Sequence, residues 1–169
     1  MVCTMFLALM FAVLEYGRLM FLWNAVQEVA RRAARGAAIT DFSDAAAMQA
    51  VRQAALLRNT DGTLVLAPNL GPPNVVVEYL WQDTAGALQP VAPLPACPSA
   101  NRVNCAREPH GSSCISFVRV RICGAGANCP ALAYQPFTAL VPVPAALPQA
   151  GTVVRAESLG YWPGMAPCP

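Results

Sequence analysis

An uninterrupted apolar run opens the chain and divides it into two parts. Residues 1–14 carry no charge, and apolar character resumes at Leu19–Trp23 after the polar stretch Glu15–Arg18. About 23 residues of this kind form about 34 Å of helix, enough to cross a hydrocarbon core about 30 Å thick. The run predicts a transmembrane helix. A cleaved signal peptide fits less well, because no basic start and no small-residue cleavage site accompany the run.

Helical periodicity continues beyond the apolar run. Residues 24–39 are mostly good helix formers without proline, with small apolar side chains on one face and arginines beside them. We therefore expect one helix of about 35 residues that spans a membrane with its first half and projects with its second. Gly36 is expected to fray or kink it.

Residues 40–169 change from helical to strand periodicity, and we treat them as a separate domain from residues 1–39. A second helix is expected at about 43–58, capped by Ser43 or Asp41. Runs of β-branched residues or alternating polarity predict strands at about 63–67, 74–81, 115–122 and 151–159.

The third of these runs alternates most clearly, with Val118, Val120 and Ile122 on one face and Arg119 and Arg121 on the other. Such a pattern is typical of an antiparallel strand with one solvated face. A proline-rich interval, residues 83–114, is expected to be a loop tied down by covalent bridges. The pattern as a whole predicts an α+β fold, with a long N-terminal helix, a short second helix, a small antiparallel sheet and disulfide-stapled loops.

Composition supports a membrane segment or an assembly surface. Charged residues make up 12% of the chain and apolar residues 56%, which is unusual for a soluble domain. The net charge of +2 is too small and dispersed for a nucleic-acid footprint, so no nucleic-acid partner is expected.

Seven cysteines are present, and Cys3 alone lies in the apolar run, where its thiol should be inert. The candidates for disulfide bonds are Cys97, Cys105, Cys114, Cys123, Cys129 and Cys168. Cysteines at this density indicate an oxidising compartment, although six of them allow fifteen connectivities. Cys123 and Cys129 bracket a flexible GAGAN segment and are the first candidates for a local bridge.

No catalytic motif, cofactor site or small-molecule substrate site is apparent. His110, the single histidine, lies between Cys105 and Cys114, but this spacing matches no known zinc ribbon or finger. A Cys/His nucleophilic pair would need a third orienting group in a structured pocket. We therefore expect no metal, no cofactor and no enzymatic activity; a thiol or zinc enzyme is the alternative that free thiols or bound zinc would reveal.

The segment Glu15-Tyr16-Gly17-Arg18, followed by LMFLWNAVQEVARRAARGAA, resembles the TadE-like family of pseudopilins. The resemblance extends from Val2 to about Ala38, with weaker echoes in VRVRI, in Tyr134–Pro142 and in TVVRAES. It implies a pilin-like minor subunit that takes part in assembly of a Tad (tight adherence) pilus and so in cell adhesion. Its expected partners are other pilus subunits and assembly platform proteins, reached through the N-terminal helix in the inner membrane.

One departure from the family pattern is expected to reflect a truncated N-terminus. The family begins with a basic leader, a glycine cleaved by prepilin peptidase and a glutamate soon after, whereas this sequence begins inside the apolar run. Arginines after the run would by themselves favour a cytoplasmic C-terminal part. The cysteines favour the periplasm, and a missing basic leader would remove the conflict.

The resemblance and the helix pattern assign helix packing and assembly to Glu15, Tyr16, Gly17, Arg18 and Asn24. Glu15 and Arg18 are three residues apart and able to pair, either as a local ion pair near the membrane interface or with a neighbouring subunit's helix. The alternative function is a membrane-anchored periplasmic binding module whose disulfide-rich loops form a ligand surface.

Overall fold

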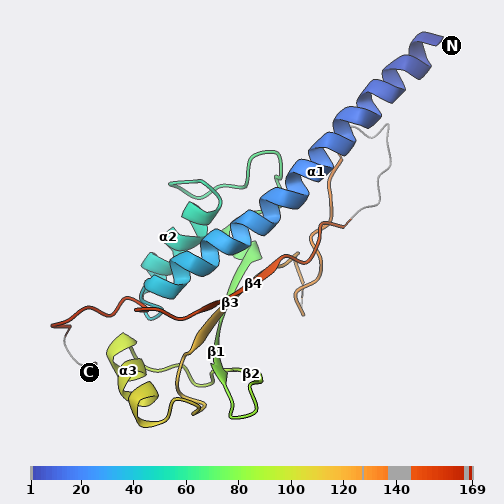
Figure 1. Ribbon diagram of the computed structural model, residues 1–169. Coiled ribbons are helices and arrows are strands. Elements are labelled where there is room, and N and C mark those ends of the chain that lie inside the picture. Colours follow the sequence, from blue (N-terminus) through green and yellow to red (C-terminus); the bar gives the residue numbers. More distant parts are fainter. Residues whose placement is uncertain (1, 127, 137–145, 166–167, 169) are drawn as a thin grey trace.

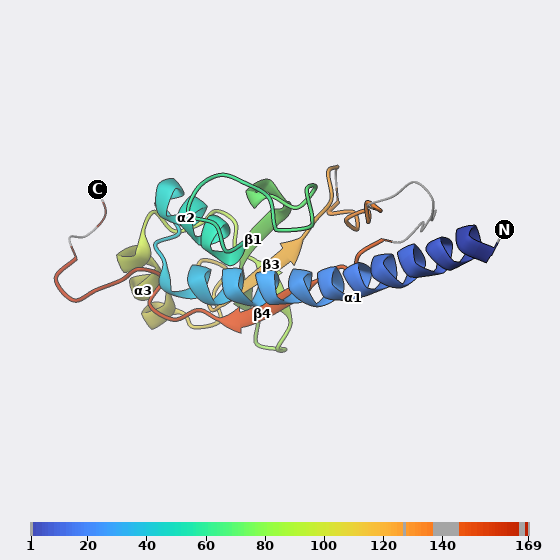
Figure 2. The ribbon, with the colours of Figure 1, turned by 90° about the horizontal axis from the view of Figure 1, so that it is seen from above.

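The N-terminal helix, α1, runs without a break from Val2 to Ile39 (Figure 1). Its 38 residues correspond to about 57 Å at the usual rise per residue. The N-terminal part extends beyond the rest of the molecule, and the C-terminal part lies along the sheet (Figure 2). The computed structural model describes residues 2–126, 128–136, 146–165 and 168.

Seven further elements follow α1 in the described part of the chain: α2 (Ala45–Ala55), a 3₁₀ turn (Pro72–Asn74), β1 (Val75–Gln82), β2 (Leu88–Pro90), α3 (Pro98–Arg107), β3 (Phe117–Ile122) and β4 (Gly151–Arg155). The strands form one sheet in the order β2-β1-β3-β4, and every neighbouring pair is antiparallel. This arrangement confirms the predicted α+β fold with a long N-terminal helix and a second helix.

The start of α2 differs from the expected one. Asp44 is the N-cap, and its carboxylate accepts hydrogen bonds from the amides of Ala46 at 2.9 Å and Ala47 at 3.1 Å. Asp41 instead accepts a bond from the Ser43 amide in the preceding turn. The prediction of Ser43 or Asp41 as the cap was therefore wrong, because three capping-type side chains lie within four residues and Asp44 is the one that binds amides of the first helical turn.

Small side chains on α1 bring the helix close to the sheet. Val26, Ala30 and Ala33 are completely buried in the main core, together with Val120 and Ile122 of β3. A helix face of alanines lets the backbone approach the strands more closely than a face of leucines would. The C-terminal half of α1 is thus a core element of the α+β domain. The domain boundary between residues 39 and 40 stays a prediction.

The other face of the sheet carries an ion-pair network of one carboxylate and two guanidinium groups. Arg119 Nε donates to Glu78 Oε2 at 2.5 Å, and Arg121 donates to the second oxygen of the same carboxylate. Burial alone would raise the pKa of Glu78, but the two arginines lower it below its ordinary value of 4.5. Glu78 of β1 lies directly opposite Arg119 of β3 in the strand register. The arginines on the predicted polar face of β3 therefore find their partner on β1.

Two element predictions were wrong. Residues 63–67 form a turn closed by an isolated bridge between Leu64 and Ala67 and do not join the sheet. The interval 83–114, predicted as a loop, contains β2 and α3. Pro98 follows the cap residue of α3, where its missing amide hydrogen costs nothing.

Three disulfides connect the six cysteines that follow the helices α1 and α2. Cys97 pairs with Cys168, Cys105 with Cys114, and Cys123 with Cys129. The first joins segments 71 residues apart and the other two close short loops, 9 and 6 residues apart. Together they fix the loops at both ends of β3.

The Gly36→Ala variant tests how tightly α1 packs on α2. A Cβ at residue 36 would lie 2.9 Å from Val51 Cγ1. In the wild-type background we expect Gly36→Ala to lower the free energy of unfolding by about 1 kcal/mol, because the cost of overpacking exceeds the gain in helix propensity. In the Val51→Ala background the same change should stabilise by about 0.5–1 kcal/mol. Urea unfolding of the full chain in detergent measures both; the same sign in both backgrounds would contradict the packing interpretation.

The Glu78→Gln variant tests the charge network on the sheet. At neutral pH we expect the free energy of unfolding to fall by about 1 kcal/mol. The loss is this small because both arginines are partly exposed to solvent. Because the folded-state pKa is lowered, the wild-type advantage is complete above the unfolded value and shrinks as the pH falls below 4.5.

Unfolding of the Glu78→Gln variant should be compared with that of Glu28→Gln, whose exposed pairs on α1 should contribute only a few tenths of a kcal/mol. An equal effect of the two variants, or a Glu78→Gln difference that grows in acid, would show that the network does not act as described.

Candidate functional site

A buried carboxylate lies at the point where α1 meets the domain. Glu15 is only 5% exposed, although the residues on either side of it are open to the surroundings. Tyr134 supplies the nearest polar group, and its hydroxyl donates to Glu15 Oε1 at 2.5 Å. Burial and this hydrogen bond both raise the pKa of Tyr134, so the hydroxyl keeps its proton and remains a donor.

Arg18 joins the helix to two separate segments of the domain. Its Nη2 donates to the carbonyl of Leu66 at 2.7 Å, and its Nη1 donates to the carbonyl of Gln135 at 2.9 Å. The same Nη1 is 3.4 Å from Glu15 Oε1, and the guanidinium carbon lies 5.3 Å from the centre of the Tyr134 ring. We call these five residues, Glu15, Arg18, Leu66, Tyr134 and Gln135, the junction cluster.

The other predicted site residues lie outside the junction cluster. Tyr16 is 64% exposed, and a Cβ at Gly17 would have no neighbouring atom of the described residues within 4 Å. Asn24 is also exposed, and its side chain donates to the Met20 carbonyl of its own helix at 3.1 Å. The structure brings Glu15 and Arg18 together but leaves Tyr16, Gly17 and Asn24 on the outward side, and their assembly role stays a prediction.

Sequence reasoning missed the partners that the domain supplies. Tyr134 lies 119 residues from Glu15, and the partners at Leu66 and Gln135 are backbone carbonyls, which any residue type could provide. A signal did exist for Tyr134, because it begins one of the weaker segments of family resemblance.

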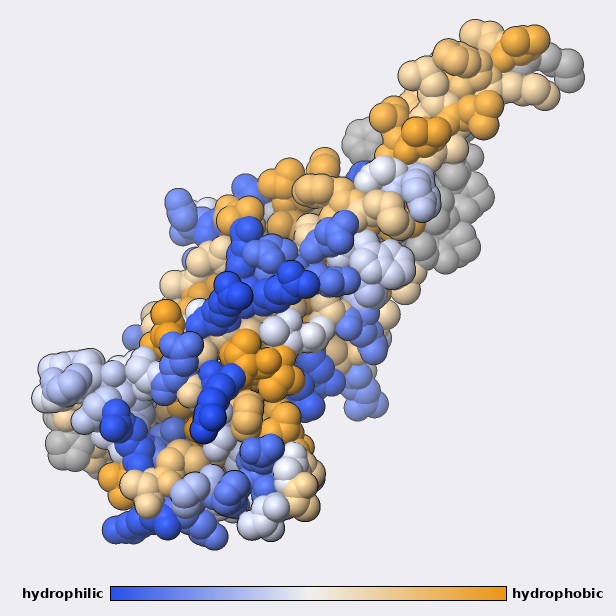
Figure 3. All heavy atoms as spheres, viewed as in Figure 1, coloured by the Kyte–Doolittle hydropathy of each residue, from blue (hydrophilic) through white to orange (hydrophobic). Residues whose placement is uncertain are grey.

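The junction cluster removes charge from the outward surface of α1. The exposed side chains between Val2 and Trp23 are all uncharged, because Glu15 and Arg18 turn toward the domain. Apolar residues accordingly gather along the projecting part of the helix (Figure 3). Within the described residues, α1 is the one helix whose length and hydropathy suit a membrane crossing.

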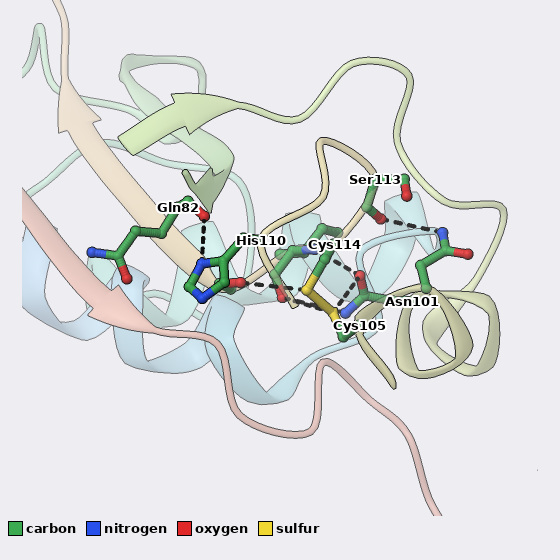
Figure 4. The surroundings of a disulfide bond; sticks show 9 residues. Gln82, Asn101, Cys105, His110, Ser113 and Cys114 are labelled. Carbon is green, nitrogen blue, oxygen red and sulfur yellow. Dashed lines mark hydrogen bonds between the residues drawn. A yellow bond between two sulfur atoms is a disulfide. The ribbon is translucent and has the colours of Figure 1, made fainter. Parts of the chain in front are cut away.

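His110 lies at the opposite end of the domain, where it contacts the backbone of β1. Its Nδ1 is 3.1 Å from the carbonyl oxygen of Gln82, and the Cys105–Cys114 bridge lies nearby (Figure 4). Asn101 accepts from the Ile115 amide at 2.8 Å and so fixes the loop next to this bridge. Because Cys105 and Cys114 are bonded to each other, neither can act as a thiolate ligand or nucleophile here.

Fold and junction cluster together define an α+β domain carried on one N-terminal apolar helix of membrane-spanning length. Comparison with known families gives a match to the model of the TadE-like protein family over residues 1–35. This match confirms the resemblance seen in the N-terminal segment, which includes Glu15 and Arg18. No curated protein and no solved structure matches the chain.

The Tyr134→Phe variant tests the junction cluster. Loss of the hydroxyl removes a hydrogen bond to a buried carboxylate, so we expect a loss of about 1.5–3 kcal/mol in stability. Hydrogen exchange of the amides near residues 132–136 and 64–67 should also accelerate, because both segments are tied to Arg18. The measurement is unfolding and hydrogen exchange of the full chain in detergent.

The matched control is Tyr16→Phe, which removes a hydroxyl from an exposed residue of α1 and should change neither quantity. Equal behaviour of the two variants would mean that the Tyr134 hydroxyl does not hold the cluster.

Proposed function

We propose that this chain is a minor pilin-like structural subunit of a Tad-type pilus that contributes to surface adhesion. The observation that carries the proposal is the N-terminal segment: residues 1–35 of the chain match the TadE-like family, and the outward surface of α1 is uncharged and mostly apolar from Val2 to Trp23. In this role the helix holds the subunit in the membrane and packs against other subunits during assembly. The chain performs no catalysis.

The proposed location is the bacterial inner membrane, with a single α1 span and the α+β domain in the periplasm. Three disulfides support this orientation, because such bonds persist in oxidising compartments and rarely in the cytoplasm. Lipid and a bundle of apolar helices both suit α1, since every backbone group within a helix is satisfied internally.

A stripe on the outward side of α1 is the proposed contact for a neighbouring subunit. Gly17, Phe21 and Asn24 lie on one helix face and are all exposed. Phe21 and Asn24 also line an apolar groove of about 380 Å³ between α1, the end of α2 and Val65. Small residues such as Gly17 allow close approach of helices within membranes.

A second candidate is a membrane-anchored binding module. It is favoured by a polar hollow of about 430 Å³ at the end of the domain near α3, lined among others by Arg102, His110, Arg155 and Glu157. Helix α3, which contributes Arg102 to this hollow, lies far from the N-terminus of α1 (Figure 1). A binding module would stay in detergent extracts of membranes and be absent from sheared pili.

Piliation of the bacterium that encodes this chain tests the proposal. Deletion of the gene should abolish or sharply reduce the amount of pili sheared from the cells, and the wild-type gene should restore it. Gly17→Leu should restore little, although a Cβ at residue 17 would meet no neighbouring atom of the described residues within 4 Å and leucine favours the helix. A loss of piliation in the Gly17→Leu strain would therefore come from contact between α1 and another molecule.

The matched control is Met10→Leu, a volume-conserving change at an exposed position of the same apolar segment, which should restore piliation fully. Membrane level and thermal unfolding of each variant confirm that the protein is present and folded. Normal piliation of the deletion strain would exclude the structural-subunit role, and full restoration by Gly17→Leu would remove Gly17 from the contact.

A further inference from the structure

Two exposed apolar side chains lie beside the junction cluster. Val65 is 59% exposed and Leu66 is 51% exposed, in the loop that connects α2 to β1. The Leu66 carbonyl accepts a bond from Arg18, so this loop is held at the level of Arg18 along α1. It extends alongside the helix toward the end that bears the N-terminus (Figure 1).

The level of Arg18 is within the apolar part of the outward surface of α1. The exposed residues on both sides of Arg18 are uncharged, with Tyr16 before it and Phe21 and Trp23 after it. Tyrosine and tryptophan gather at membrane–water interfaces, where the ring is apolar and its polar end reaches water. The outward side of α1 therefore has the residues of an interfacial belt at the height where Leu66 is fixed.

Backbone chemistry sets how deep this loop can lie. Irregular backbone exposed to lipid does not occur in the hydrocarbon region, because its amides and carbonyls would have no partners. The loop therefore cannot enter the hydrocarbon core, but it can lie in the headgroup region with side chains directed into the acyl boundary. Val65 and Leu66 are apolar and exposed, as such a position requires.

We propose that Val65 and Leu66 dock on the phospholipid surface of the membrane in which α1 is anchored. This inference rests on the membrane anchoring in the proposed function and adds a second contact between the domain and the bilayer. Arg18 links the two contacts, since it bonds the helix to the loop. The domain is thereby held against the membrane at a fixed height and rotation about α1.

Depth-dependent fluorescence quenching tests this contact in the full chain. A cysteine at Leu66, in a Cys3→Ser background with the three disulfides intact, carries an NBD fluorophore. The protein is reconstituted at low protein-to-lipid ratio into vesicles of phosphatidylcholine and phosphatidylglycerol with a nitroxide at acyl carbon 5. We expect about twofold quenching at Leu66→Cys, with Val65→Cys as an independent second site.

Two control positions make the outcomes distinguishable. Leu9→Cys, on the exposed part of α1, should be quenched if the helix is in the bilayer. Leu94→Cys, an equally exposed leucine between β2 and α3, should not be quenched. If Leu9→Cys is quenched but Leu66→Cys and Val65→Cys are quenched no more than Leu94→Cys, the docking is overturned. The membrane anchor then remains supported. Absence of quenching at Leu9 overturns both.

Discussion

The rest of the structure depends on one constraint: a carboxylate and a guanidinium in an apolar helix need polar partners. An ion pair alone would not satisfy Glu15 and Arg18, because taking both charges out of water costs more than their attraction returns unless further hydrogen bonds are made. Tyr134 and the carbonyls of Leu66 and Gln135 provide those bonds. Two loops from distant parts of the chain are thus fixed to α1 at one height.

The same helix acts as a projecting apolar segment and as part of a folded core. These roles require different surfaces, and the change takes place at the junction cluster. Before it, large apolar side chains are exposed; after it, small ones such as Ala30 and Ala33 are buried against β3. Because α1 is one continuous helix, the orientation of the domain is coupled to that of the projecting apolar segment.

Much of this fold could be predicted from local pattern. The length of α1, the alternation in β3 and the three-residue spacing of Glu15 and Arg18 are all properties of short segments. What failed depended on tertiary context. Residues 63–67 have the β-branched and apolar composition of a strand, but their backbone closes on itself and the Leu66 carbonyl is used by Arg18. Tyr134 could not be paired with Glu15, since nothing local encodes a contact across 119 residues.

Burial of the charges within the chain also bears on movement between environments. If Glu15 and Arg18 depended on a partner subunit, leaving the bilayer for a helical assembly would expose or re-pair them, at a cost of several kcal/mol per ion. In this structure their partners belong to the same chain and move with α1. Lipid and a neighbouring apolar helix would therefore meet the same uncharged surface, and under the proposed function packing at residues such as Gly17 and Phe21 would decide the exchange of one for the other.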